Sequence, residues 1–319
     1  MTTTLSAPAA ARTEFFEFDA IGCHHRVVVL GECDLARVER LTQARIEQLD
    51  LAVSRFRADS ELSRLNARSD KAARRGEDVV TAPISLTFLA AMRAALRTAS
   101  LTDGLVVPHL GRQIEVAGYD VDLDLVRRRG DLARRERVTP HLLPLPTICS
   151  AERSVTLAAG SHLDLGGSAK AWCAQILAEE IALEFGVGVL VSLGGDIATS
   201  GPIPGRGWEI DVRDASARIL QRIRVREAVA TSSTRLRRWV SAGEERHHII
   251  DPRTGRSATP IWAQVSAAAP DTVQANAATT AAVILGKDAP AWLEGHGVPA
   301  LLQGADGQIV TTSGWQAPA

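Results

Sequence analysis

Two glycine pairs, each directly after a short apolar run, are the first segments of this sequence that could do chemistry. Residues 163–172 read LDLGGSAKAW, and residues 192–201 read SLGGDIATSG. Gly166 and Gly167 allow a sharp turn and a close approach to a ligand, because glycine has no Cβ atom. A helix that begins after this turn would offer free N–H groups to phosphate oxygens. The first pair therefore indicates either a phosphate-binding turn or an ordinary strand-to-helix turn.

Charged residues follow both pairs. Lys170 would lie in the first turn of the helix, where the helix dipole disfavours a cation unless an anion is bound. Asp196 follows Gly194 and Gly195 and could bind a hydroxyl group or a metal-bound water, or simply cap a turn.

Hydroxyl and imidazole side chains form the next two candidate groups. Thr231 and Ser232 begin a run of hydroxyl residues at 231–234, followed by three arginines, which indicates either phosphate binding or a turn. In HHIIDPRTG, at 247–255, the proline and glycine predict a turn that presents His248 and Asp251 at a strand end. His248 is then a base or ligand-orienting group, or else a structural histidine.

The segment ANAATTAAVILG, at 275–286, could bind a metal ion. On a helix, Asn276 and Thr280 are four residues apart and share a face. Both side chains offer the oxygen ligands that Mg²⁺ prefers. The alternative is that Asn276 caps the helix and Thr280 packs against the preceding turn.

Helices and strands must position these groups. Apolar spacing predicts helices over residues 34–56, 84–101, 168–185 and 273–285. It also predicts a strand over 15–30, two short strands around 160–161 and a buried strand over 187–196, so that strand, helix and strand would form a βαβ-like unit. WEIDVRD, RVREAVATSS, HHIIDP and QVSAAAP have the composition of further strands, whereas residues 120–148 are predicted to form a surface excursion.

Composition limits the class of protein. The chain has 319 residues, of which 45% are hydrophobic and 23% charged, and a formal net charge of −1. This balance favours a globular protein and gives no reason to expect nucleic-acid binding. Residues 1–13 are predicted to be a flexible tail, and 14–317 a single catalytic domain with two interleaved lobes. The basic run at 127–137 is interpreted as a solvated loop or helix end.

The sequence also suggests a cellular location. No apolar stretch is long enough to span a membrane, and the N-terminal residues do not resemble a signal peptide. The four cysteines are scattered and form no CxxC pair, which favours reduced thiols. We therefore expect a cytoplasmic protein without a membrane span.

Taken in order, these motifs resemble the ApbE-type FAD:protein FMN transferases. The resemblance runs from about residue 18 to 287 and includes SELSRLN, which ends at Asn66, LDLGGSAKAW, VSLGGD, VATSS, HHIIDPRTG and ANAATTAAVILG. It implies an α+β, two-lobed, T-fold-like architecture with antiparallel or mixed sheets and packed helices. It also implies a function: transfer of FMN from FAD to a threonine or serine hydroxyl of an acceptor protein, with Mg²⁺ on the pyrophosphate and release of AMP.

The resemblance assigns roles to particular residues. His248 corresponds to the family's functional histidine. The Gly167 carbonyl, Asn276 and Thr280 are expected to hold the metal ion, and Ile21 to line the flavin pocket. The residues expected to bind FAD are Asp164, Gly166, Lys170, Gly194, Gly195, Asp196, Thr231 and Ser232.

Two positions depart from the family pattern. Asn276 stands where the family has a metal-binding aspartate, and Val107 stands where the Phe-Asp-Pro-Thr block has its aspartate. An amide oxygen still coordinates Mg²⁺, but it brings no negative charge. These departures favour one alternative function, an FAD-binding protein without transfer activity. A second alternative is an FAD pyrophosphatase that yields FMN and AMP, because the same site would serve if water replaced the protein hydroxyl.

Overall fold

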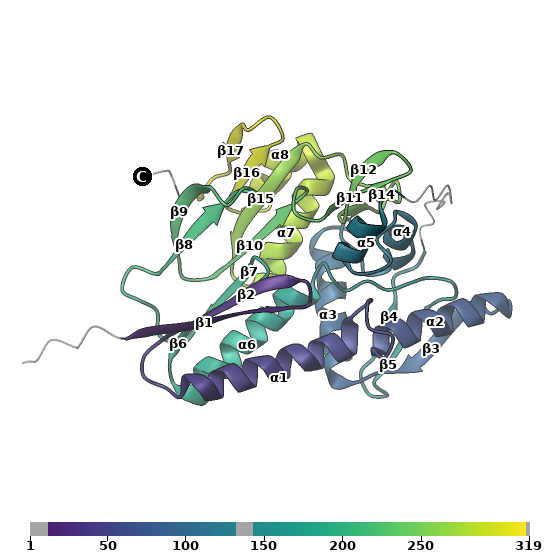
Figure 1. Ribbon diagram of the computed structural model, residues 1–319, viewed down its shortest axis with the longest axis horizontal. Helices are drawn as coiled ribbons and strands as arrows, with labels where there is room; N and C mark the ends of the chain where they lie inside the picture. Colours follow the sequence, from purple (N-terminus) through teal and green to yellow (C-terminus); the bar gives the residue numbers. More distant parts are fainter. Residues whose placement is uncertain (1–11, 132–142, 317–319) are drawn as a thin grey trace, which may run out of the picture.

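The computed structural model describes residues 12–131 and 143–316, and an eight-stranded sheet runs through its centre (Figure 1). The paired strands of this sheet are antiparallel. In spatial order the strands are β1 (Thr13–Ala20), β2 (Cys23–Leu30), β6 (Gly188–Leu193), β7 (Asp196–Ser200), β10 (Ala228–Ser233), β15 (Trp262–Ala269), β16 (Ala300–Gly304) and β17 (Ile309–Thr311).

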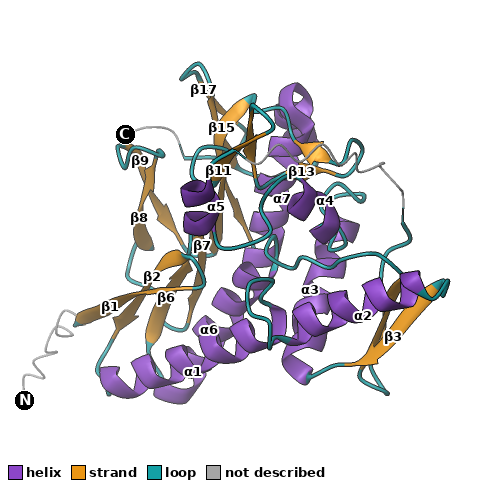
Figure 2. Ribbon diagram, turned by 45° about the vertical axis from the view of Figure 1, so that its right-hand side comes forward, coloured by secondary structure: helices purple, strands orange, loops and turns teal. Residues whose placement is uncertain are grey.

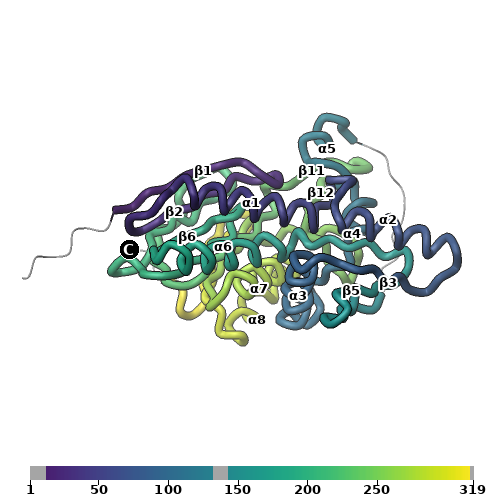
Figure 3. Tube along the Cα trace, turned by 90° about the horizontal axis from the view of Figure 1, so that it is seen from below, coloured from purple at the N-terminus to yellow at the C-terminus, as the bar shows by residue number. Residues whose placement is uncertain are grey.

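Helices pack against one face of the sheet (Figure 3). Side chains on this face of β2 and β6, such as Val27 and Val189, share a core with Leu49 and Leu177 on two of these helices. A second core joins the last two helices to β15 and β16. The helices are α1 (Leu35–Val53), α3 (Leu86–Leu101), α6 (Ala169–Phe185), α7 (Thr272–Leu285) and α8 (Ala289–Gly295), and the short 3-10 helix Gly286–Asp288 links the last two.

The opposite face of the sheet is covered by a hairpin of β8 (Trp208–Arg213) and β9 (Ile219–Val225). Successive residues of a strand point to opposite faces, so Leu190 joins the hairpin's core while its neighbours Val189 and Val191 face the helices. Burial on both faces explains why β6 is apolar without alternation over Gly188–Val191, before the half-buried Ser192.

Two smaller groups of elements complete the described chain. A three-stranded sheet lies beside α2 (Glu61–Arg74), at the end of the molecule far from β1 (Figure 2), and consists of β3 (Val79–Pro83), β5 (Ser154–Ala158) and β4 (Thr147–Cys149). The second group shares a core around Tyr119 and Trp239. It contains α4 (Gly111–Val116), α5 (Leu123–Arg129), β11 (Arg238–Ser241), β12 (Glu244–His247), β13 (Ile250–Asp251) and β14 (Arg256–Ser257).

The prediction of one strand over residues 15–30 is wrong. The structure has two strands there, β1 and β2, joined by a two-residue turn at Ile21 and Gly22. Both turn residues have positive φ, 43° and 68°. A β-branched residue rarely adopts this conformation, so an isoleucine at position 21 does not indicate a turn.

The predicted βαβ-like unit is also wrong, because residues 161–165 form no strand. The Asn66 side chain takes the place of a neighbouring strand: its Nδ2 donates to the Leu163 carbonyl at 3.0 Å, and its Oδ1 accepts from the Leu163 N–H at 2.8 Å. The Asp164 N–H donates to the Pro108 carbonyl. The backbone of Leu163 and the Asp164 N–H are therefore hydrogen-bonded, but residues 161–165 belong to no sheet.

Most other predicted elements are confirmed. The four predicted helices correspond to α1, α3, α6 and α7, and the predicted strand over 187–196 to β6. Residues 120–148 contain α5 and the start of β4, while residues 132–142 and the N-terminal tail to residue 11 lie outside the described residues. All four cysteines are free thiols. In the described residues, no helix is both long and apolar enough to cross a membrane.

Candidate active site

Three segments meet at the candidate site: the first turn of α6, the β6–β7 turn and the first half of α7. Asn276 on α7 donates from Nδ2 to Oδ1 of Asp196, which begins β7, at 2.9 Å. A Cβ atom on Gly194 would lie 3.6 Å from Cε of Lys170 on α6. The Thr272 hydroxyl at the start of α7 donates to Gln175 on α6 at 2.8 Å. The two glycine turns and the α7 helix are therefore neighbours, as the sequence predicts.

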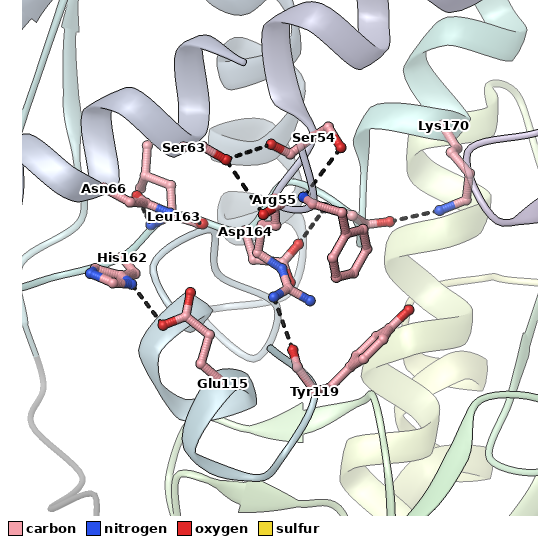
Figure 4. Close-up of polar contacts among 12 residues, drawn as sticks. Ser54, Arg55, Ser63, Asn66, Glu115, Tyr119, His162, Leu163, Asp164 and Lys170 are labelled. Carbon is pink, nitrogen blue, oxygen red and sulfur yellow. Dashed lines mark hydrogen bonds and ion pairs between the residues drawn. The ribbon is translucent and has the colours of Figure 1, made fainter. Parts of the chain in front are cut away.

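Asp164 fixes the turn that leads into α6 (Figure 4). Its Oδ1 accepts from the Gly166 N–H at 2.7 Å, and its Oδ2 pairs with Arg55 Nε at 2.8 Å. Arg55 also donates to the Tyr119 carbonyl at 3.0 Å, and its guanidinium lies over the Tyr119 and Phe56 rings. Both carboxylate oxygens thus have partners within the chain, and the expected contact of Asp164 with FAD stays a prediction.

The N-terminal end of α6 keeps features of an anion site. Ser168, the residue before the helix, makes no side-chain cap. Lys170 lies in the first turn and folds back so that Nζ donates to the Gly166 carbonyl at 3.1 Å. Within the part of the chain that the structure describes, Lys170 forms no ion pair with a carboxylate.

The second glycine pair is required by close packing. Gly194 has φ +64°, and a Cβ atom there would lie 2.9 Å from Cys23 Sγ on β2. Gly195 has φ +100° and faces Thr231. This turn buries Asp196, which is only 4% exposed. Burial raises the pKa of Asp196, against the opposing effects of the Lys170 charge and the hydrogen bond from Asn276.

Asn276 does not cap α7, so the alternative reading of that residue is wrong. Asp271 is the cap, and its side chain accepts from the Gln274 N–H. Asn276 lies in the second turn and is 8% exposed, and its Oδ1 is a buried oxygen that has no hydrogen-bond partner among the residues the structure describes. Buried polar atoms in native proteins are nearly always paired, so this oxygen marks a place where a ligand would bind.

The hydroxyl residues of β10 are divided between two faces. Ser232 faces α7 and hydrogen-bonds with Thr279 at 2.9 Å and Thr280 at 3.1 Å. Thr231 faces the other way and hydrogen-bonds with Ser266 on β15 at 2.8 Å. Ser232 and Thr280 are therefore adjacent, whereas Thr231 reaches the site only beside Gly195.

The two adjacent histidines have different surroundings. His247 is satisfied: its Nε2 lies 2.7 Å from the Ala258 carbonyl, and its Nδ1 accepts from the Ile249 N–H. His248 is bonded to the backbone of Arg237, while its Nδ1 is buried and has no hydrogen-bond partner in the described part of the chain. Burial lowers the pKa of His248 well below its ordinary value, and the charge of Arg237 adds to this effect. His248 is therefore the one of these two histidines whose ring is neutral and whose Nδ1 has no hydrogen-bond partner in the described residues.

Arg237 is a site residue that sequence reasoning did not single out. Its Nη2 lies 2.6 Å from Cys23 Sγ, and its charge acts on both Asp196 and His248. In the described residues it pairs with no carboxylate. The only available signal was the run of three arginines after residue 234, which does not tell which of them points into the site.

Two expected residues lie at the margin. Ile21 occupies the strained tip of the β1–β2 hairpin, two residues from Cys23, and its contact with a flavin stays a prediction. The Asp251 carboxylate is paired with Arg253, and Arg253 also donates to the Ile284 carbonyl. The structure therefore separates Asp251 from the site chemistry.

Replacing Arg55 with methionine should lower the free energy of unfolding by about 2 to 3 kcal/mol, because it leaves Asp164 without its buried partner. The Arg55 and Asp164 side chains are only 6% and 20% exposed. Urea denaturation measures the change. Arg57→Met is the matched control, since Arg57 forms its ion pairs at the surface, and equal losses in the two variants would contradict the role given to Arg55.

Comparison with known proteins adds independent evidence. The ApbE family model matches residues 21–302. The FAD:protein FMN transferase of Treponema pallidum is 30% identical over 291 residues, which covers 84% of this chain and 77% of that protein. The FAD:protein FMN transferase of Vibrio cholerae is 26% identical over 267 residues, covering 81% and 76% of the two chains.

Solved structures agree with the fold. The crystal structure of the ApbE protein from Thermotoga maritima superposes with a TM-score of 0.80 at 25% identity, over 95% of this chain and 97% of that chain. The flavin transferase ApbE from Vibrio cholerae superposes with a TM-score of 0.72 at 20% identity, over 95% and 98%. These likenesses confirm the predicted α+β fold class.

Proposed function

The chain belongs to the ApbE family, and on that basis we propose that it is an FAD:protein FMN transferase. It would move FMN from FAD to a threonine or serine hydroxyl of an acceptor protein and release AMP. The relatives that bear this name match the chain over most of their length.

One observation carries the proposal: groups of complementary chemistry surround one point. Lys170 and Arg237 are cations without a carboxylate partner in the described residues, and they suit the oxygens of a diphosphate. His248 Nδ1 is a neutral, unpartnered acceptor beside them. A diphosphate, and a hydroxyl group that must lose a proton, would use these groups together.

The residues also fit a bound Mg²⁺ ion. The Asn276 Oδ1, unpartnered in the described residues, and the Thr280 hydroxyl are hard oxygen donors of the kind that Mg²⁺ selects, and the Gly167 carbonyl stays a predicted third ligand. Such an ion, when bound, would neutralise charge on the diphosphate and the departing AMP.

The protein's own residues would carry out the transfer as follows. Lys170 and Arg237 hold the diphosphate, and the turn around Gly194, which lies exposed before the buried Asp196, shapes the neighbouring wall. The acceptor hydroxyl oxygen bonds to the FMN-side phosphorus, and the bond from that phosphorus to the bridging oxygen breaks. His248 Nδ1 accepts the hydroxyl proton, and AMP leaves with the bridging oxygen.

Incubation of the purified protein with FAD and Mg²⁺ tests this function. We expect AMP release only when an acceptor protein is present, together with covalent flavin on that acceptor. AMP release without an acceptor would instead indicate FAD hydrolysis, and intact bound FAD would indicate a binding protein. Either of these results would overturn the proposed transfer.

A cytoplasmic location stays a prediction. The four free thiols support it, because reduced cysteines are typical of a reducing compartment.

A further inference from the structure

Asp196 and Asn276 form a buried polar pair at the centre of the site. The carboxylate begins β7 and the amide lies on α7, and they are 4% and 8% exposed. The Asn276 Nδ2 donates to the Asp196 Oδ1 at 2.9 Å. No other hydrogen bond of the Asn276 side chain is present among the described residues.

This hydrogen bond fixes which way the amide points. A carboxylate only accepts hydrogen bonds, so the NH₂ end of Asn276 must face Asp196. The carbonyl end, Oδ1, then points elsewhere and keeps its lone pairs in a buried place. Leaving a buried acceptor unpaired is costly, so the arrangement is expected where a donor or cation occupies that place.

The negative charge next to Asn276 comes from Asp196. In the described ranges, no group of three histidine, cysteine, aspartate or glutamate side chains could hold a metal ion. The Asp164 carboxylate already forms an ion pair with Arg55 and accepts a hydrogen bond from the Gly166 N–H. Asp196 is thus the carboxylate that directly contacts Asn276.

We propose that Asp196 supplies the negative charge of the cation site and Asn276 Oδ1 supplies a neutral ligand, with the hydrogen bond between them holding the two in register. A task that a single aspartate at position 276 would perform is divided here between two side chains. The inference rests on the proposed function, because the cation is the one that would bind the FAD diphosphate.

Exchange of the two residues tests the proposal. In the double variant Asp196→Asn/Asn276→Asp, the total charge and the hydrogen bond are both kept, with the amide now at position 196. The single variant Asp196→Asn loses the charge. Mn²⁺ serves as the probe, and its free concentration is followed by electron paramagnetic resonance while ADP supplies a diphosphate that is not turned over.

We expect Asp196→Asn to weaken Mn²⁺ binding by about 10- to 100-fold, as for a group that orients or balances a metal ligand. The double variant should recover most of the loss. Thermal melting establishes that each variant is folded. A folded Asp196→Asn protein with wild-type Mn²⁺ affinity would overturn the proposal, and so would a folded double variant as weak as the single one.

The outcome is separable from that of the proposed function. The predicted Mn²⁺ pattern in a protein that transfers no FMN would support this inference and overturn only the function. FMN transfer by a wild-type protein that binds no Mn²⁺ in the presence of ADP would support the function and overturn this inference.

Discussion

Replacing His248 with alanine should slow FMN transfer by about 10²- to 10⁴-fold, the range for loss of a general base. FAD affinity should change little, because the histidine acts on the incoming hydroxyl and not on the diphosphate. Stopped assays of AMP release and an FAD titration measure the two quantities. His296→Ala is the matched control, since His296 is exposed on the far end of α8. An unchanged transfer rate in His248→Ala would remove the residue from the mechanism.

The pH dependence follows from the direction of the shift. Burial lowers the pKa of His248 well below 6.5, so the folded ring is neutral at pH 6.5. The transfer rate should stay constant as the pH falls through 6.5 and decline only near the lowered pKa. The same ring contributes its full stability above the unfolded pKa of about 6.5, and that contribution is lost as the pH falls toward the folded pKa. His248→Ala should therefore unfold with a weaker pH dependence between about pH 7 and pH 5.

Lys170→Ala should weaken FAD binding by about 10- to 100-fold, which corresponds to losing one hydrogen bond to a charged group. Among residues 12–131 and 143–316, the ammonium group hydrogen-bonds only to the Gly166 carbonyl, and it could move to a phosphate oxygen. ADP should lose affinity to the same extent, whereas riboflavin, which has no phosphate, should not.

Lys287→Ala is the control, because that lysine is exposed beside α8. Fluorescence titration with the three ligands gives the comparison. Equal losses for ADP and riboflavin in Lys170→Ala would mean that the lysine supports the fold and not the diphosphate.

The sequence predicted those parts of the fold that depend on local periodicity. Helices α1, α3, α6 and α7 have apolar faces of regular spacing, and each is confirmed. The Gly194 turn was also recognisable, because only glycine tolerates its positive φ and its contact with Cys23. For these elements, the sequence neighbours supply most of the information.

The errors arose where distant residues decide the local structure. Residues 161–165 have the composition of a strand, but the Asn66 side chain, 97 positions away, bonds to both backbone groups of Leu163 in place of a neighbouring strand. The turn at Ile21 is held by the pairing of β1 with β2, against the preference of an isoleucine.

The site was predicted only in part, because sequence motifs indicate candidate residues but not their contacts with distant residues. The order of the motifs indicated Lys170, Asp196, His248 and Asn276 as candidates. In the structure Asn276 hydrogen-bonds to Asp196, and the charge of Lys170 acts on both Asp196 and His248. Arg237 and Arg55 were missed, since their partners Cys23 and Asp164 lie 214 and 109 positions away in the chain (237 − 23 and 164 − 55). Nothing in their local sequence indicates a contact over such a separation.

The central claim is that the first turn of α6 and the first half of α7 close on one diphosphate, with a cation between them. A crystal structure with FAD and Mn²⁺, with an anomalous difference map recorded at the manganese edge, tests it most directly. The account predicts the FAD diphosphate at Lys170 and a manganese peak within about 2.5 Å of Asn276 Oδ1. A diphosphate bound away from Lys170, or a manganese peak that Asn276 does not touch, would contradict it.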